Sequence, residues 1–429
     1  MEDAEVVVIG AGAAGLAAAR ALVDAGVSVR VVEARERVGG RIWTLHEVES
    51  TLPIELGAEF VHGRPREIFD LVKKKRLPFF EYDGDLWCSE KGDLGPCPEQ
   101  EKVLEKVFDK MPKSGKDQSF RQYLDKQNFD DSVRTKALAY IEGFEAAEPD
   151  RMSARALVRE NRASDDIDGD RDFRVESGYD TLLRVIAAGL EKVIELDQPV
   201  HVLKWKRGSV ICECDTRTIK AEKAIVTLPL GVLQAGAVKF SPALPKKKAL
   251  SLLATGPVMR IVLEFRERFW AQMKVGNRSL KKLSFLFSDA EVFPTWWTPN
   301  PREAPMLTGW SAGPRVKGLV FREKEHVFDE ATKTLAKLLH MSVGEVRSLV
   351  YRAHIHDWQA DVFSLGAYSW AKVGGLNAFR EMASPVQETV FFAGEATNSD
   401  GYNGTVHGAI ASGRRAAREV MRERRRGFR

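Results

Sequence analysis

The stretch that decides the fold lies close to the start of the chain: residues 6–41 read VVVIGAGAAGLAAARALVDAGVSVRVVEARERVGGR. The continuous apolar run at 6–9 is typical of a strand buried on both faces, and residues 27–32 predict a second strand. Between them, the alanine-rich segment 13–25 predicts a helix that ends at a glycine. A Gly-x-Gly-x-x-Gly pattern joins the first strand to this helix. The stretch therefore predicts the β-α-β unit of a dinucleotide-binding fold.

Three glycines and one carboxylate give this unit its expected chemistry. Gly10 permits the tight turn, Gly12 lets the backbone approach a pyrophosphate, and Gly15 lets the helix pack closely on the strand. The N-terminus of the helix offers free N–H groups to the phosphates. Glu33 follows the second strand, where its carboxylate can accept hydrogen bonds from both hydroxyls of a ribose. A carboxylate at that place disfavours a 2′-phosphate.

A second glycine turn, Gly39-Gly40-Arg41, follows at once, and from here on the chain resembles the flavin-containing amine oxidase family. That family includes monoamine oxidases, polyamine and spermine oxidases, L-amino-acid oxidases and flavin-type histone demethylases. Five further segments, in the family's order, carry the resemblance: ELGAEFVHG (55–63), ESGYDTL (176–182), VTLPLGVL (226–233), FFAGEAT (391–397) and YNGTVHGA (402–409). Together they span nearly the whole chain.

The resemblance implies an FAD bound in an extended pose by residues that are distant in the sequence. It places Glu33 at the adenosine ribose, Val200 at the adenine, and Gly57 beside the isoalloxazine ring. The start of the last helix, near Thr405, is expected to direct an N–H at the flavin O2, where a helix N-terminus stabilises negative charge. The full set of expected cofactor residues is Gly10, Gly12, Ala14, Gly15, Glu33, Ala34, Arg35, Gly40, Arg41, Gly57, Ala58, Glu59, Val200, Gly394, Glu395, Gly404, Thr405 and Val406. Monoamine oxidases of this family join the flavin to a cysteine just before the aromatic wall. Residues 357–368 contain no cysteine, so the resemblance implies a non-covalently bound FAD.

The fold class that the resemblance implies is α/β: a Rossmann-like FAD-binding domain of the two-dinucleotide-binding-domain type, with an inserted α+β substrate domain on a mixed sheet. The FAD-binding segments are expected at 1–75, 170–255 and 385–429. The insertion 76–169 is mostly helical by pattern, and the insertion 256–384 begins with alternating strands. We expect the two insertions to form one substrate domain and the reactive ring to lie where the domains meet.

The activity implied by the resemblance is oxidation of an amine. A hydride equivalent passes from the carbon beside nitrogen to flavin N5, the imine hydrolyses to an aldehyde and an amine, and O2 reoxidises the flavin to give H2O2. This hydride step requires no Ser-His-Asp triad and no metal site.

Seven residues are expected in front of the flavin. The catalytic candidates are Arg260, His62, Trp370 and Thr405, and the pocket candidates are Trp297, Glu59 and Tyr368. Trp370 is expected as one aromatic wall, with Thr405 where many family members have the second. His62, which corresponds to a histidine of some polyamine oxidases, could accept a proton from a substrate ammonium. His62 and Thr405 favour polyamines, and acidic residues such as Glu59, Glu142, Glu145 and Glu176 could attract cations.

Arg260 departs from the family, whose lysine at this position is tied to reoxidation by oxygen. Two alternatives follow: an amine dehydrogenase with a different electron acceptor, or an L-amino-acid oxidase in which Arg260 binds the substrate carboxylate. A third, more distant alternative is an FAD-binding protein without catalytic activity.

Composition limits the remaining possibilities. The 429 residues carry 65 basic and 61 acidic side chains, and much of the basic excess lies in 418–429, which we interpret as a solvated tail. The four cysteines, Cys88, Cys97, Cys212 and Cys214, have the spacing of neither a zinc site nor a secreted disulfide framework, which favours a reducing compartment. No signal peptide and no long apolar run is evident. We expect a cytoplasmic protein that acts on a small amine and O2, without a nucleic-acid or membrane partner; the oligomeric state stays open.

Overall fold

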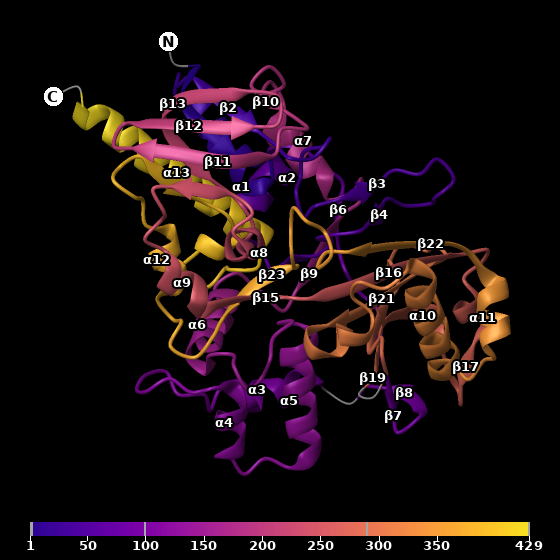
Figure 1. Cartoon of the computed structure of the whole chain (residues 1–429). Coiled ribbons are helices and arrows are strands. Elements are labelled where there is room, and N and C mark those ends of the chain that lie inside the picture. Colours follow the sequence, from indigo (N-terminus) through magenta and orange to yellow (C-terminus); the bar gives the residue numbers. More distant parts are fainter. Residues whose placement is uncertain (1–2, 98–99, 289–290, 428–429) are drawn as a thin grey trace.

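The structure, a computed structural model, describes residues 3–97, 100–288 and 291–427. It has two β-sheet lobes and a group of helices below them (Figure 1). The first lobe, at the upper left of the figure, contains an eight-stranded sheet. The second lobe, at the right, contains a seven-stranded sheet.

The first lobe contains the predicted β-α-β unit at the middle of its sheet. Strand β1 (Ala4–Ile9) is parallel to β2 (Val29–Val32) on one side and to β13 (Thr218–Val226) on the other. Because both neighbours and both faces are occupied, the apolar residues of β1 from Val6 to Ile9 are almost fully buried. The other strands are β10 (Ile194–Glu195), β12 (Ser209–Cys214), β11 (Val200–Lys206), β14 (Lys239–Ser241) and β24 (Val390–Phe392).

Two helices from opposite ends of the chain pack together in this lobe. They are α1 (Ala13–Asp24) and α13 (Val406–Gly427), which Figure 1 shows beside each other in indigo and yellow. A Cβ atom at Gly413 would lie 2.1 Å from the Ala14 carbonyl oxygen, so only glycine allows this approach. Gly15 is restricted in the same way, since its Cβ would lie 1.9 Å from the Gly10 carbonyl oxygen. Gly413 thus lets the last helix pack against the dinucleotide-binding helix, and Gly15 lets that helix pack against the turn at Gly10.

The second lobe contains a mixed sheet with the strand order β22-β16-β21-β20-β19-β7-β8. The strands are β22 (Val350–Asp357), β16 (Val258–Phe265), β21 (Met306–Ala312), β20 (Thr295–Trp297), β19 (Leu283–Ser288), β7 (Asp85–Glu90) and β8 (Asp93–Pro96). Only the β19–β7 pair is parallel. Helices α10 (Lys324–Leu338) and α11 (Val343–Leu349) pack against it and bury a cluster that includes Trp270 and Trp296.

The helical group lies below the two lobes and comes from the first predicted insertion (Figure 1). It consists of α3 (Gln100–Phe108), α4 (Phe120–Asp125), α5 (Asp131–Gly143) and α6 (Ala154–Asp165), in agreement with the mostly helical pattern of 76–169. Ser119, Asp130 and Ser153 cap three of these helices through side-chain oxygens that accept backbone N–H groups. Both insertions contribute to the second-lobe sheet, because β7 pairs with β19. The exact domain boundaries stay predictions.

Short elements join the lobes and position the site. In the middle of Figure 1 lie β15 (Leu253–Gly256), β23 (Tyr368–Ala371) and β9 (Asp172–Val175), between the two large sheets. Strand β9 pairs with β5 (Val61–His62) and β6 (Phe79–Glu81). The remaining elements are β3 (Thr44–Leu45), β4 (Ile54–Glu55), α2 (Arg66–Lys75), α7 (Asp180–Ala187), α8 (Leu230–Ala235), α9 (Lys247–Leu252), β17 (Lys274–Val275), β18 (Arg278–Ser279) and α12 (Ala378–Ala383), with short 3-10 helices at Phe269–Gln272, Leu280–Lys282, Gly313–Gly318 and Glu395–Thr397.

One structural feature differs from the cysteine interpretation. Cys88 and Cys97 form a disulfide at the β7–β8 hairpin, whereas Cys212 and Cys214 are free. The spacing of Cys88 and Cys97 did not indicate a bridge. The β7–β8 hairpin brings the two cysteines together, and the spacing alone does not show such a hairpin. Among the helices of the described residues, none combines the length and the apolar character that a membrane span requires.

Candidate active site

A cavity of about 910 Å³ extends between the two lobes and is lined by residues from both. Of the predicted site residues, Gly10, Gly12, Ala14, Glu33, Ala34, Arg35, Gly40, Arg41, Gly57, Ala58, Glu59, His62, Val200, Arg260, Trp297, Tyr368, Gly394, Glu395, Gly404, Thr405 and Val406 line it. Gly15 does not line it and has the packing role described above. Trp370 does not line it either.

The end of the cavity in the first lobe has the shape of a dinucleotide cradle. Gly10 has a φ of +105°, which favours glycine. A Cβ atom at Gly12 would meet only the Gly39 carbonyl oxygen, at 3.8 Å, so this backbone is open to a ligand. Glu33 accepts hydrogen bonds from the backbone N–H groups of Ala11 (2.6 Å) and Arg35 (3.1 Å), which fix its carboxylate at the end of β2. These residues fit the adenosine and pyrophosphate of an extended FAD.

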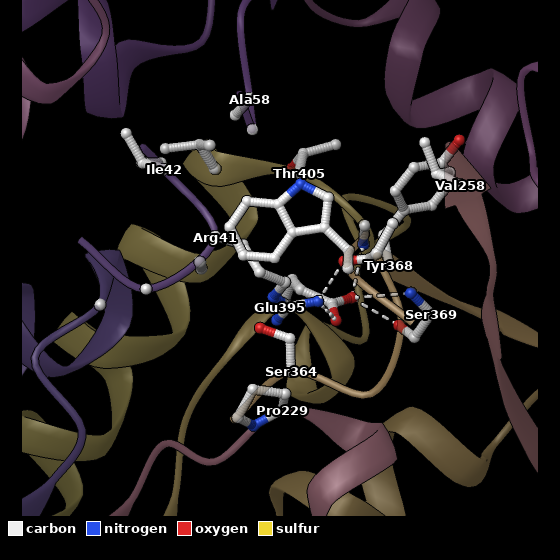
Figure 2. Close-up of a pocket in the computed structure, with 18 of the residues that line it drawn as sticks. Arg41, Ile42, Ala58, Pro229, Val258, Ser364, Tyr368, Ser369, Glu395 and Thr405 are labelled. Atoms are coloured by element: carbon white, nitrogen blue, oxygen red, sulfur yellow. Dashed lines mark hydrogen bonds and ion pairs between the residues drawn. The ribbon is translucent and has the colours of Figure 1, made fainter. Parts of the chain in front are cut away.

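A buried carboxylate organises the middle of the cavity (Figure 2). Glu395 accepts hydrogen bonds from Arg41 (2.9 Å), the Ser369 hydroxyl (2.5 Å) and the Gly404 N–H (2.9 Å). Thr405 donates its hydroxyl hydrogen to the Tyr402 carbonyl oxygen and begins the last helix. The N-terminus of α13 therefore faces the cavity, as the resemblance implied for the flavin O2.

A buried Arg–Glu–Arg cluster lies beside Gly57, and two of its members, Glu59 and Arg260, line the cavity. The Glu59 carboxylate is paired with Arg260 on one oxygen and with Arg174, at 2.7 Å, on the other. It also accepts the indole N–H of Trp297 at 3.1 Å, and Arg260 donates to the Gly57 carbonyl oxygen at 2.7 Å. The expected pocket residues Glu59 and Trp297 are thus part of the support for Arg260, whose guanidinium is already engaged.

Arg174 and Asp172 were not predicted from the sequence. They lie on β9, where the alternating DFRV pattern buries Phe173 and Val175 and turns the two charged residues to the opposite face. Asp172 is directly opposite His62 of β5 and lies 2.6 Å from its Nδ1. The strand alternation could have indicated that these two charges share a face; it could not have named their partners.

One acidic residue, Glu145, lines the substrate side of the cavity, and its charge interacts with that of Glu160. No side chain in the described part of the chain pairs with the Glu145 carboxylate. Burial, together with the charge of Glu160, raises its pKa well above the ordinary value. Burial also raises the pKa of Glu160, which accepts a hydrogen bond from the Asn403 amide at 2.9 Å. Glu142 and Glu176, also considered from the sequence, are instead paired with Arg315 and Arg302.

The prediction that Trp370 forms an aromatic wall was wrong, and Tyr368 lies at the cavity instead. Trp370 lies two residues further along β23 on the same face. At that position the face lies beyond the end of the cavity and packs against the helical group. Trp370 is therefore buried in a cluster with Phe120 and Tyr123. Tyr368 donates its hydroxyl hydrogen to the Phe144 carbonyl oxygen at 2.5 Å, and Figure 2 shows it at the right of the pocket, beside Val258.

Comparison with known proteins identifies the family. The family model described as "flavin containing amine oxidoreductase" matches residues 13–85 and 98–421. Polyamine oxidase 4 of Oryza sativa subsp. japonica is 30% identical over 97% of this chain and 88% of its own length. Polyamine oxidase 2 of Arabidopsis thaliana is 29% identical over 96% and 87%, respectively. Lysine-specific histone demethylase 2 of Homo sapiens is also 29% identical, over 97% of this chain but 53% of its own.

Solved structures share the fold. Wild-type putrescine oxidase bound to putrescine superposes with a TM-score of 0.84 at 23% identity, over 98% of this chain and 99% of its own. Cyclohexylamine oxidase from Brevibacterium oxydans IH-35A gives 0.82 at 21% identity, over 99% and 100%. The predicted fold class is confirmed. The chain belongs to the flavin-containing amine oxidoreductases: it is an FAD-dependent enzyme that oxidises amines and holds its FAD non-covalently.

Proposed function

We propose that the protein oxidises a cationic amine, with polyamines as the preferred class, and passes the electrons to O2 to give H2O2. The FAD supplies the redox chemistry: it accepts a hydride equivalent from the carbon beside the substrate nitrogen. The chain's own residues bind the amine, orient it at the ring and keep water away.

The observation that carries this proposal is Glu145, whose carboxylate has no side-chain partner among the residues that the structure describes. Burial, and after it the charge of Glu160, raises the pKa of Glu145, because a buried carboxylate beside another ionises only when a cation is near. A substrate ammonium placed at Glu145 supplies that cation. The polyamine oxidases among the relatives support the substrate class.

Aromatic walls complete the substrate side. Phe60 lies 5.6 Å from Trp297 and 5.9 Å from Phe285, centroid to centroid. On α5 and just after it, Tyr140 and Phe144 are stacked at 5.0 Å. Such walls exclude water and attract ammonium groups through the ring faces.

The position of Arg260 does not favour the alternative of an L-amino-acid oxidase. Arg260 would have to bind a substrate carboxylate, but its terminal nitrogens already bond Glu59 and the Gly57 carbonyl oxygen. A carboxylate that approached would meet Glu59 as well. We therefore place amines without a neighbouring carboxylate ahead of amino acids.

The test is anaerobic mixing of the purified FAD-loaded protein with spermine, spermidine, putrescine, cyclohexylamine, benzylamine and lysine. Loss of the oxidised flavin absorbance identifies the substrates, and readmitted air, with a peroxide assay, tests the acceptor. Glu145→Gln should raise KM for the polyamines at least tenfold, because the ammonium loses its counter-charge. Glu148→Gln, an exposed carboxylate nearby, is the matched control. If no amine reduces the flavin, the proposed function is wrong.

A further inference from the structure

We propose that Asp172 is a positioning residue that holds His62 with Nε2 available to take the proton of the substrate ammonium. This inference rests on the proposed function, because it concerns the same cavity. It assigns a role to a carboxylate that the sequence pattern did not single out.

The strand pairing fixes the geometry. His62 and Asp172 are directly opposite each other in the antiparallel β5–β9 pair, and so are their neighbours Val61 and Phe173. Directly opposite residues project from the same face of a sheet. Val61 and Phe173 are buried in the first-lobe core, so the other face, with the two polar residues, is turned to the cavity, which both line.

The hydrogen bond selects the tautomer. The Nδ1 atom of His62 lies 2.6 Å from the Asp172 carboxylate, which only accepts, so Nδ1 carries the hydrogen. The remaining nitrogen, Nε2, has no protein partner in the described part of the chain. With 37% of its side-chain surface exposed, the imidazole is accessible from the cavity. This arrangement presents a basic nitrogen to whatever occupies the cavity.

Rings hold the imidazole in place. Phe144 contacts it edge-on at 5.5 Å between centroids, and Phe60 lies at 6.2 Å on another side. Both rings also belong to the substrate walls. The imidazole is therefore positioned by one polar and two aromatic neighbours, between the walls that the proposed function assigns to the amine.

Asp172 is the neighbouring charge that determines the direction of the pKa shift of His62. Burial alone would lower the pKa of His62, but the charge and hydrogen bond of Asp172 outweigh it and raise the pKa. His407 at the start of α13 stays neutral, because burial lowers its pKa to about 3. Tyr140 on α5 and Tyr82, whose pKa values burial raises well above the ordinary, stay neutral as well.

The proton balance is simple. The N–H bond of the substrate ammonium breaks, its electron pair stays on nitrogen, and the proton bonds to Nε2. The imidazolium that forms is stabilised by Asp172, and the amine becomes uncharged, the state in which its carbon can release a hydride. The imidazolium later returns the proton to water.

Asp172→Asn tests the role, because the amide oxygen can still accept from Nδ1 while the charge is lost. We expect the rate of flavin reduction to fall at least tenfold. The acidic limb of the kcat/KM profile should move to lower pH by about one unit. Asp172→Glu should recover most of the rate. Asp170→Asn, an exposed carboxylate of the same segment, should change neither quantity.

Two comparisons separate a positioning role from a structural one. In the His62→Gln background, Asp172→Asn should have no further effect on the rate. The pH dependence of His62 carbethoxylation, taken as the difference between wild type and His62→Gln, reports the histidine without any substrate. An unmoved acidic limb, additive effects of the two substitutions, or an unchanged carbethoxylation profile would each overturn the role of Asp172. If no amine reduces the wild type, the proposed function has failed, and carbethoxylation alone decides this inference.

Discussion

Arg35 and Asp361 form a two-pronged ion pair that joins the lobes beside the ribose-binding end of the cavity. The two guanidinium nitrogens of Arg35 lie 2.9 and 2.7 Å from the two carboxylate oxygens of Asp361, and His356 holds the same carboxylate at 2.9 Å. Burial would raise the pKa of Asp361, but the hydrogen bonds from His356 and Arg35 hold it well below its ordinary value. Ser364 and Phe363, just beyond it, line the cavity.

The Arg35–Asp361 pair is expected to retain the cofactor. In Asp361→Asn, one charge-assisted contact of about 1.5–3 kcal/mol is lost, and the segment after β22 is released from Arg35. The dissociation constant for FAD, measured by fluorescence titration of the apoprotein, should rise about 10- to 100-fold. Glu388→Gln breaks the exposed Arg207–Glu388 pair and is the control. An unchanged FAD affinity in Asp361→Asn contradicts the prediction.

Glu59 is expected to be important for stability as well as for the site. Its removal leaves Arg174 and Arg260 buried without the carboxylate that forms an ion pair with each of them. Breaking a buried ion pair on one side typically costs about 3–5 kcal/mol. Glu59→Gln should therefore lower the melting temperature markedly, in both the FAD-loaded and the apo form, by differential scanning fluorimetry. A change confined to the FAD-loaded form would instead place Glu59 in contact with the cofactor alone.

Arg260→Lys tests whether the arginine limits the use of oxygen. A lysine keeps the positive charge near Glu59, but its single ammonium group is smaller than the guanidinium and frees space beside Gly57. The reduced enzyme should then be reoxidised faster by O2 in a stopped-flow experiment. The reductive half-reaction is the internal reference, since it should change less. An unchanged oxygen rate means that Arg260 is no obstacle to reoxidation.

Glu55 is expected to make the folded state less stable as the pH rises. Burial raises its pKa from 4.5 to about 7, although Thr44 and the Tyr179 N–H donate hydrogen bonds to it. The folded protein therefore binds this proton more tightly than the unfolded chain. The stabilisation, about 3 kcal/mol, is complete below pH 4.5 and lost as the pH rises through 7.

Glu55→Gln resembles the protonated carboxyl and should remove this dependence. The melting temperature of the wild type should fall between pH 5.5 and 8, and that of the variant should fall less. Thermal melts of both proteins across this range are the measurement. Parallel curves for the two proteins would show that Glu55 does not titrate with a raised pKa.

The sequence predicted those parts of the site that are local in the chain. Patterns of a few residues determine the local backbone conformation. The β-α-β unit, the place of Glu33 and the turns at Gly40 and Gly404 could therefore be predicted from such patterns. The pairs that join distant segments could not be read in this way. Asp172 meets His62 only because β9 pairs with β5, and no spacing along the chain encodes that register.

The prediction for Trp370 was wrong for a related reason. The motif around Trp370 was identified correctly, but the place of this residue along the strand relative to the cavity was not. The alternation of β23 puts Tyr368 and Trp370 on one face, and only the place where the cavity ends separates their roles. A sequence pattern fixes which face a residue belongs to. It does not fix how far along that face the neighbouring cavity extends.

Paired variants of these two residues test the revised assignment. Trp370→Phe leaves a gap in the helical cluster and should lower the free energy of unfolding by about 1–3 kcal/mol, with little change in flavin reduction. Tyr368→Phe removes the hydrogen bond to the Phe144 carbonyl oxygen and frees the wall that carries Glu145. It should raise KM for the amine and slow flavin reduction several-fold, with a smaller effect on the melting temperature. Stopped-flow reduction and thermal melts of both variants give the comparison. Should Trp370→Phe slow flavin reduction tenfold while melting like the wild type, Trp370 acts at the cavity after all.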